Sequence, residues 1–178
     1  MRSAACGLGI GRQTASLVAA VLLGTHLASA ETIDRVLAVV AGQIITLSDV
    51  TAARELKLET AGSAPDPTRA LLSKLIDREL MLAEMERYAP PEPTAEAVDR
   101  ELDAIRGRFE SQPAFDAVLA RSGIDAKHVR ETVRQNLRIR TYMDQRFAPA
   151  DERRETLIAE WLTGLRRRAD VIDLYQLR

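Results

Sequence analysis

The chain has 178 residues, of which 46% are hydrophobic and only 4% aromatic, enough for one domain with a core but short for two. Its 25 lysines and arginines nearly balance its 26 aspartates and glutamates, for a formal charge of −1. Such a near-neutral chain is not typical of a nucleic-acid-binding protein, and its single cysteine excludes an internal disulfide framework.

Residues 1–30 have the organisation of a signal peptide. Arg2 and Arg12 give a positive start, the stretch TASLVAAVLLG is apolar, and the segment ASA that ends at Ala30 has the small-x-small pattern that a signal peptidase cleaves. The competing interpretation is an uncleaved membrane anchor, but a spanning helix needs roughly 20 apolar residues and this stretch is shorter. We therefore expect cleavage after Ala30, export to the periplasm, no stable membrane insertion, and one domain over residues 31–178.

The rest of the chain predicts two strands, a series of helices and a last strand. Short β-branched and leucine-rich runs at 35–40 and 43–47 flank Gly42, which favours strands. Ser48 is suited to cap the helix that follows, and proline-containing breaks separate several of the later helices. The expected helices span residues 49–60, 68–88, 94–109, 113–123, 125–147 and 152–168, and the expected last strand spans 170–177.

The two N-terminal strands need a partner, because a lone two-stranded hairpin is marginal in water. The tail DVIDLYQL is the other strand candidate, and we expect its Ile172 and Leu174 to cover apolar residues. The predicted fold is therefore mainly α, with five to six helices and a small antiparallel sheet formed by the N-terminal hairpin and the C-terminal strand.

Four stretches, in this order, carry a resemblance to a known family. They are VLAVVAGQIITLSDV (36–50), LLSKLIDRELMLAEMERY (71–88), VRETVRQNLRIRTYM (129–143) and WLTGLRRRADVIDLY (161–175). Together they resemble the N-terminal region of the SurA family of periplasmic chaperones for outer-membrane proteins, with that family's returning C-terminal helix and strand. The resemblance covers about residues 33–177 and implies a domain whose tail folds back onto the hairpin.

Two departures from that family are informative. At the hairpin turn, where the family often has Asn-Gly, this chain has Ala41-Gly42, and alanine has no easy access to positive φ, so we expect another turn type or a longer loop. Family members commonly carry parvulin-type prolyl isomerase domains between the long helix and the last helix, where this chain has only FAPADE (147–152). The resemblance therefore implies a member without isomerase domains.

No sequence pattern predicts an active site. A parvulin site resembles a pocket with two histidines, and beyond residue 30 the chain has only His128. We find no histidine and cysteine set for a metal, no glycine loop for a phosphate, and no acid in an apolar setting that would raise its pKa. Arg130, Arg134 and Arg138 lie at helical spacing, which we interpret as a solvated helix face. We expect no enzymatic activity, cofactor, metal or nucleic-acid partner, with a degenerate prolyl isomerase as a minor alternative.

Binding is the remaining class of function. The resemblance implies an ATP-independent chaperone, a holdase, for unfolded apolar or aromatic segments of exported proteins, chiefly outer-membrane proteins. Methionine-bearing surfaces suit such clients because they repack around many shapes, and the helix at 68–88 has more apolar faces than one contact covers, so we expect part of the set to stay exposed. The alternative is a non-catalytic adaptor for one folded partner in envelope assembly. The candidate peptide-binding residues are Met81, Leu82, Met85, Phe109, Phe115, Tyr142, Met143 and Phe147.

Overall fold

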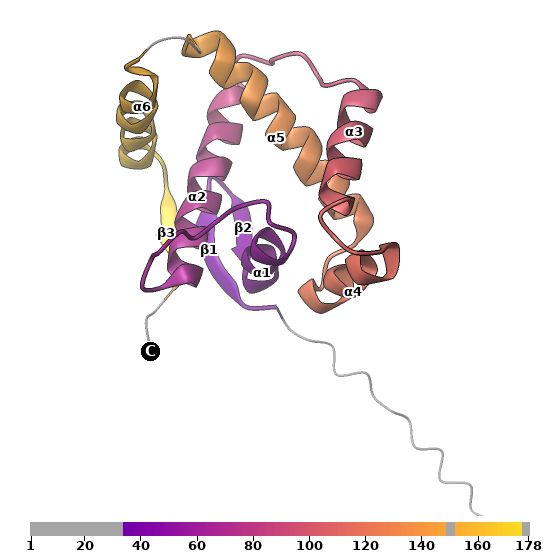
Figure 1. Ribbon diagram of the computed structural model, residues 1–178. Helices are drawn as coiled ribbons and strands as arrows, with labels where there is room; N and C mark the ends of the chain where they lie inside the picture. Colours follow the sequence, from indigo (N-terminus) through magenta and orange to yellow (C-terminus); the bar gives the residue numbers. More distant parts are fainter. Residues whose placement is uncertain (1–33, 149–151, 176–178) are drawn as a thin grey trace, which may run out of the picture. The chain divides into compact units, whose positions relative to one another are not determined.

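A computed structural model describes residues 34–148 and 152–175 (Figure 1). The expected signal peptide and its cleavage site lie outside these residues. Within them the fold is mainly helical, with six helices and a small three-stranded antiparallel sheet, so the predicted fold class is confirmed. The elements are β1 (Val36–Val40), β2 (Gln43–Thr46), α1 (Leu47–Glu55), α2 (Pro67–Met85), α3 (Ala95–Arg106), α4 (Gln112–Ser122), α5 (Ala126–Arg146), α6 (Arg154–Arg168) and β3 (Val171–Asp173).

The sheet joins the two ends of the domain. β1 is the central strand, with β2 on one side and β3 on the other, and both pairings are antiparallel. Figure 1 shows β3, in yellow, beside β1, in indigo. The predicted closure of the hairpin by the C-terminal strand is confirmed, although this strand is shorter than the expected 170–177.

The hairpin turn differs from the prediction. Ala41 and Gly42 alone connect β1 to β2, with φ of 49° and 82°. Two positive φ values in a two-residue loop are the pattern of a type I′ turn, whose twist matches that of the flanking strands. The expectation of another turn type or a longer loop is wrong, because strand pairing outweighs the preference of alanine for negative φ.

The inner face of the sheet packs against α2 and α6. On β3 only Val171 points inward to this core, whereas Ile172 and Leu174 are 50% and 46% exposed. The expectation that Ile172 and Leu174 cover apolar residues is wrong, because alternation along the strand turns both of them to the opposite face. The buried residues of this core are Leu37, Ala38, Val40, Ile45, Val50, Leu71, Leu72, Ile76, Leu80 and Leu165.

Side-chain caps mark where helices α1 to α5 begin. α1 begins at Leu47 because Thr46, and not the predicted Ser48, is its N-cap. The Thr46 hydroxyl accepts from the Asp49 N–H at 3.3 Å, and the Asp49 carboxylate accepts from the Thr46 N–H at 2.8 Å. α1 also ends at Glu55, before the predicted residue 60. Thr94 caps α3 at the predicted position.

The arginine stripe on α5 forms ion pairs with neighbouring elements. Arg130 pairs with Asp99 of α3, and Arg138 lies 3.1 Å from carboxylate oxygens of both Glu86 and Glu92. Only 9% of the Arg138 side chain is exposed. The interpretation as a solvated face holds for Arg130, whose side chain is 44% exposed, and is wrong for Arg138, because the segment between α2 and α3 brings Glu86 and Glu92 to it.

None of the helices within the described ranges has the length and apolar character needed to cross a bilayer.

A second core lies where α1, α3, α4 and α5 meet, and it is separate from the core under the sheet. Its buried residues are Ala52, Leu56, Val98, Leu102, Ile105, Phe115, Val118, Leu119, Val129 and Val133.

Candidate functional site

The eight predicted binding residues fall into two groups. Phe109 and Phe115 belong to the second core, with their ring centroids 5.5 Å apart. The other six come together where α2, α5 and α6 meet, and we call this group the α2–α5–α6 cluster. Its members are Met81, Leu82, Met85, Tyr142, Met143 and Phe147.

The α2–α5–α6 cluster is interior packing. Trp161 of α6 lies over it, with its ring centroid 6.1 Å from that of Tyr142 and 5.6 Å from that of Phe147. Burial raises the pKa of the Tyr142 hydroxyl. Of the eight predicted residues, Met85, Phe115, Tyr142 and Met143 are buried and the others are half-buried.

None of the eight is fully exposed, and Met81, Leu82, Phe109 and Phe147 keep part of their surface accessible. The second helix does have several apolar faces, and the sheet, α5 and α6 together cover most of them. The exposed aromatic side chain at this end of the fold is Tyr88, which was not among the predicted residues. It is 57% exposed, and its ring centroid lies 5.6 Å from that of Tyr142.

The outer face of the sheet is apolar and open. Val39 lies opposite Ile44 on one side and Ile172 on the other, so the three side chains form one row across the sheet. Ile44 is 60% exposed, the highest value among the large apolar residues of the described chain. Leu174 follows Ile172 on the same face, and Val36 lies opposite Thr46. We call these five residues, Val36, Val39, Ile44, Ile172 and Leu174, the outer sheet face.

A cleft of about 210 Å³ lies between β2 and α5, with α1 and α2 forming its other walls. Its apolar lining includes Ile44, Leu75 and Val129. Ile44 thus belongs both to the outer sheet face and to the wall of the cleft. The acidic lining residues are Asp49, Glu59, Glu79 and Glu131, and the basic ones are Arg78 and His128.

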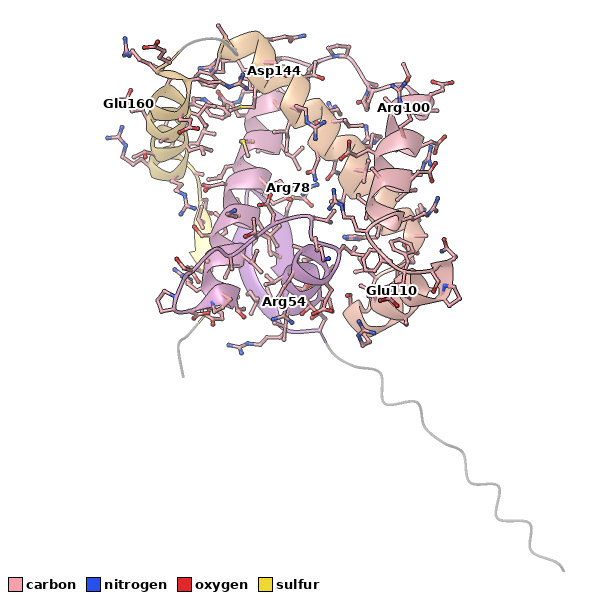
Figure 2. The ribbon with its side chains drawn as sticks, in the orientation of Figure 1. Arg54, Arg78, Arg100, Glu110, Asp144 and Glu160 are labelled. Atoms are coloured by element: carbon pink, nitrogen blue, oxygen red, sulfur yellow. The ribbon has the colours of Figure 1, made fainter. Side chains whose placement is uncertain are left out.

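Arg78 organises the polar side of the cleft. Figure 2 shows this side chain between α2 and α5. Its Nε donates to Asn136 Oδ1 at 2.9 Å, and its Nη2 donates to Gln135 Oε1 at 2.5 Å, both on α5. Its Nη1 donates to Oε1 of the adjacent Glu79, also at 2.5 Å. One guanidinium therefore ties α2 to α5 and holds a carboxylate in the cleft.

Glu79 is a carboxylate in a largely buried position. Burial raises its pKa, Arg78 opposes that effect, and the negative charge of Asp49 adds to it. Asp49 faces His128 across the cleft, with 3.6 Å between Asp49 Oδ1 and His128 Nε2. The His128 side chain is half exposed at the edge of the cleft.

Glu79 was not among the residues predicted from the sequence, although a signal for it exists. Glu79 follows Leu72 and Leu75 at the spacing of seven and four residues that places side chains on one helix face. An acid within an apolar stripe marks a helix face that meets both a core and a polar cavity. The expectation that no acid stands in an apolar setting that raises its pKa is therefore wrong for Glu79.

The cleft and the outer sheet face offer apolar contact and acidic groups. Across residues 34–148 and 152–175, no three histidine, cysteine, aspartate or glutamate side chains are grouped so that they could hold a metal ion. In comparisons with known proteins, no family model and no curated protein sequence matches the chain.

Proposed function

We propose that the protein is an ATP-independent chaperone, a SurA-like domain without isomerase modules, that binds apolar segments of unfolded exported proteins in the periplasm. The resemblance to the SurA family indicates outer-membrane proteins as the clients. The observation that carries the proposal is the outer sheet face, an exposed apolar row across three strands. Contiguous exposed apolar residues on a small domain mark a surface that binds another polypeptide.

The energetics of this face suit a holdase. Burial of the exposed parts of Ile44, Ile172 and Leu174 against a client gains on the order of 1 kcal/mol each, at about 25 cal/mol per Å² of apolar surface. Association itself costs roughly 4 to 15 kcal/mol of lost motional freedom. One such contact is therefore weak, and the client leaves without an external energy source.

The proposal is tested by light scattering from several unrelated β-barrel proteins that are diluted out of denaturant. The protein is expected to suppress aggregation of all of them. Suppression of none, together with tight binding to one native protein, would instead establish the alternative, an adaptor for a single folded partner.

A pair of variants assigns the activity to the outer sheet face. Ile44→Thr combined with Ile172→Thr keeps β-branched residues in both strands and removes apolar surface. Tyr88→Ser is the matched control, since Tyr88 is the exposed aromatic beside the α2–α5–α6 cluster. The threonine variant is expected to lose most of the suppression, and the control is expected to keep it. Loss of suppression in Tyr88→Ser, with suppression kept in the threonine variant, would instead assign client binding to the α2–α5–α6 cluster.

A further inference from the structure

β2 has a free edge that faces the cleft. The strand order leaves no strand beyond β2 in the described part of the chain, and Gln43, Ile44 and Ile45 of β2 line the cleft. Unpaired strand edges are the places where proteins add an extended peptide as a further strand. The backbone groups that β2 presents at this edge follow from its pairing with β1.

The hydrogen-bond pattern places the backbone N–H and C=O of Ile44 at the free edge. On the β3 side, Leu37 accepts from Leu174 N–H at 2.9 Å and Ala41 N–H donates to Asp170 at 3.4 Å, so odd-numbered residues of β1 bond toward β3. Val39 therefore bonds toward β3 as well, and its opposite residue, Ile44, bonds away from β1.

The edge is short and has a defined end. The next residue of β2 with the same orientation is Thr46, whose N–H is taken by the carboxylate of Asp49 at 2.8 Å. Ile44 therefore offers one donor and one acceptor, enough for one residue of an added strand. The volume of about 210 Å³ is below the roughly 300–1,000 Å³ of small-molecule sites, and it matches one or two side chains.

The two sides of this edge are chemically different. On one side lies the outer sheet face, where Ile44 is exposed. On the other side lies the cleft, with Glu79 and Asp49 on its walls. Because side chains of a strand alternate between its two sides, a strand added to β2 meets apolar and acidic surroundings in turn.

The charges of the cleft favour a cation. Its lining has four carboxylates, Asp49, Glu59, Glu79 and Glu131, against the guanidinium of Arg78 and the imidazole of His128. Lys74 and Arg134, outside the lining, pair with Glu59 and Glu131. Glu79 and Asp49 each have two oxygens, and a carboxylate has lone pairs for more than one donor, so both keep capacity for a further cation.

We propose that the protein binds an extended client segment by strand addition to β2 at Ile44, with apolar side chains toward the outer sheet face and a lysine or arginine in the cleft beside Glu79 and Asp49. This inference rests on the proposed chaperone function and names its substrate class. The segments are amphipathic strands that alternate apolar and basic residues. Strands with one apolar and one polar face are also what the walls of outer-membrane barrels consist of.

The test measures binding of two soluble peptides by the full protein. One alternates valine with lysine and the other alternates valine with glutamate, at equal length. The lysine peptide is expected to bind at least about tenfold more tightly, the equivalent of about 1.4 kcal/mol. Glu79→Gln is expected to reduce this ratio several-fold, while Glu110→Gln, an exposed acid on another part of the chain (Figure 2), leaves it unchanged.

Hydrogen exchange tests the strand addition itself. The amide of Ile44 is expected to exchange more slowly in the complex, and a lysine peptide with alternate N-methylated residues is expected to lose both the protection and the affinity. Equal affinity for the lysine and glutamate peptides would overturn the inference. Binding of the lysine peptide without slower exchange of the Ile44 amide would overturn it as well. Suppression of aggregation that persists in that case would leave the chaperone function standing and reject only this mode of binding.

Discussion

The Tyr175 hydroxyl donates a 2.8 Å hydrogen bond to Oδ2 of Asp66, the N-cap of α2. The other oxygen of the same carboxylate accepts from the N–H of Arg69 at 2.9 Å. Two hydrogen bonds hold the pKa of Asp66 below its usual value, the larger effect coming from the Arg69 N–H and the smaller from the Tyr175 hydroxyl. The same bond to Asp66 raises the pKa of Tyr175. One side chain therefore caps α2 and fixes the segment that follows β3.

Removal of the chain after Ala169 tests the closure of the sheet. The deletion removes the ladder bond from Leu174 N–H to Leu37, the ion pair of Arg69 with Asp173 at 2.5 Å, and the inward contact of Val171. At about 1 kcal/mol for each hydrogen bond and about 1 kcal/mol for a half-buried valine, the free energy of unfolding is expected to fall by at least ~2 kcal/mol.

Thermal unfolding by circular dichroism and the emission of Trp161 measure this loss. A lower Tm and a red-shifted emission are expected for the deletion. Tyr175→Phe is the matched variant, because it removes only the bond to Asp66, and its Tm is expected to fall less. A deletion with unchanged Tm and emission would show that the tail contributes nothing to the fold.

Glu79→Gln gives a pH-dependent change in stability. Burial raises the folded-state pKa of Glu79, so its contribution to stability is fully present below the unfolded value of about 4.5 and is lost as the pH rises through the folded pKa. Glutamine has no charge to bury. The variant is therefore expected to have a higher Tm than the parent at pH 7 and the same Tm near pH 4. A lower Tm at pH 7 would mean that the ion pair with Arg78 outweighs the cost of burial.

Ala41→Asn is expected to stabilise the hairpin. Ala41 has φ of 49°, a conformation that costs a non-glycine residue about 1 kcal/mol, and asparagine is favoured at the first position of a type I′ turn. The free energy of unfolding from urea denaturation is expected to rise by about 0.5 to 1 kcal/mol. Gly42→Ala, at φ of 82°, is expected to lower it. A loss of stability in Ala41→Asn would contradict this description of the turn.

Processing is predicted from the sequence alone. Mass spectrometry of the protein recovered from a periplasmic fraction is expected to identify Glu31 as the first residue, because the pattern that ends at Ala30 is a signal peptidase site. Recovery of the intact chain from Met1 in the membrane fraction would contradict both cleavage and the proposed location.

The elements could be predicted from the sequence because their signals are local. Thr94 and Asp125 cap helices where the pattern indicates, and the β-branched tail does pair with the hairpin. The first helix start was misplaced because two candidate caps, Thr46 and Ser48, lie two residues apart, and the capping box of Thr46 with Asp49 decides between them.

The candidate site could not be predicted in the same way, because it depends on which faces neighbouring elements cover. Alternation shows that Val171 and Ile172 point in opposite directions, but it does not show which of them meets α2. Met85 and Tyr142 have the composition of a binding surface, yet α6 packs over them. Ile44 and Glu79 come together at the cleft only through the tertiary fold.

Site-specific photo-crosslinking tests the central claim most directly, since it reports which surface touches an unfolded client. A photoreactive residue in place of Ile172, on the outer sheet face, is expected to crosslink to several unfolded β-barrel proteins. The same residue in place of Asp116, exposed on α4, is the control and is expected to give no product. Crosslinks from position 116 that equal those from position 172, or none from 172, would contradict the assignment of client binding to the outer sheet face.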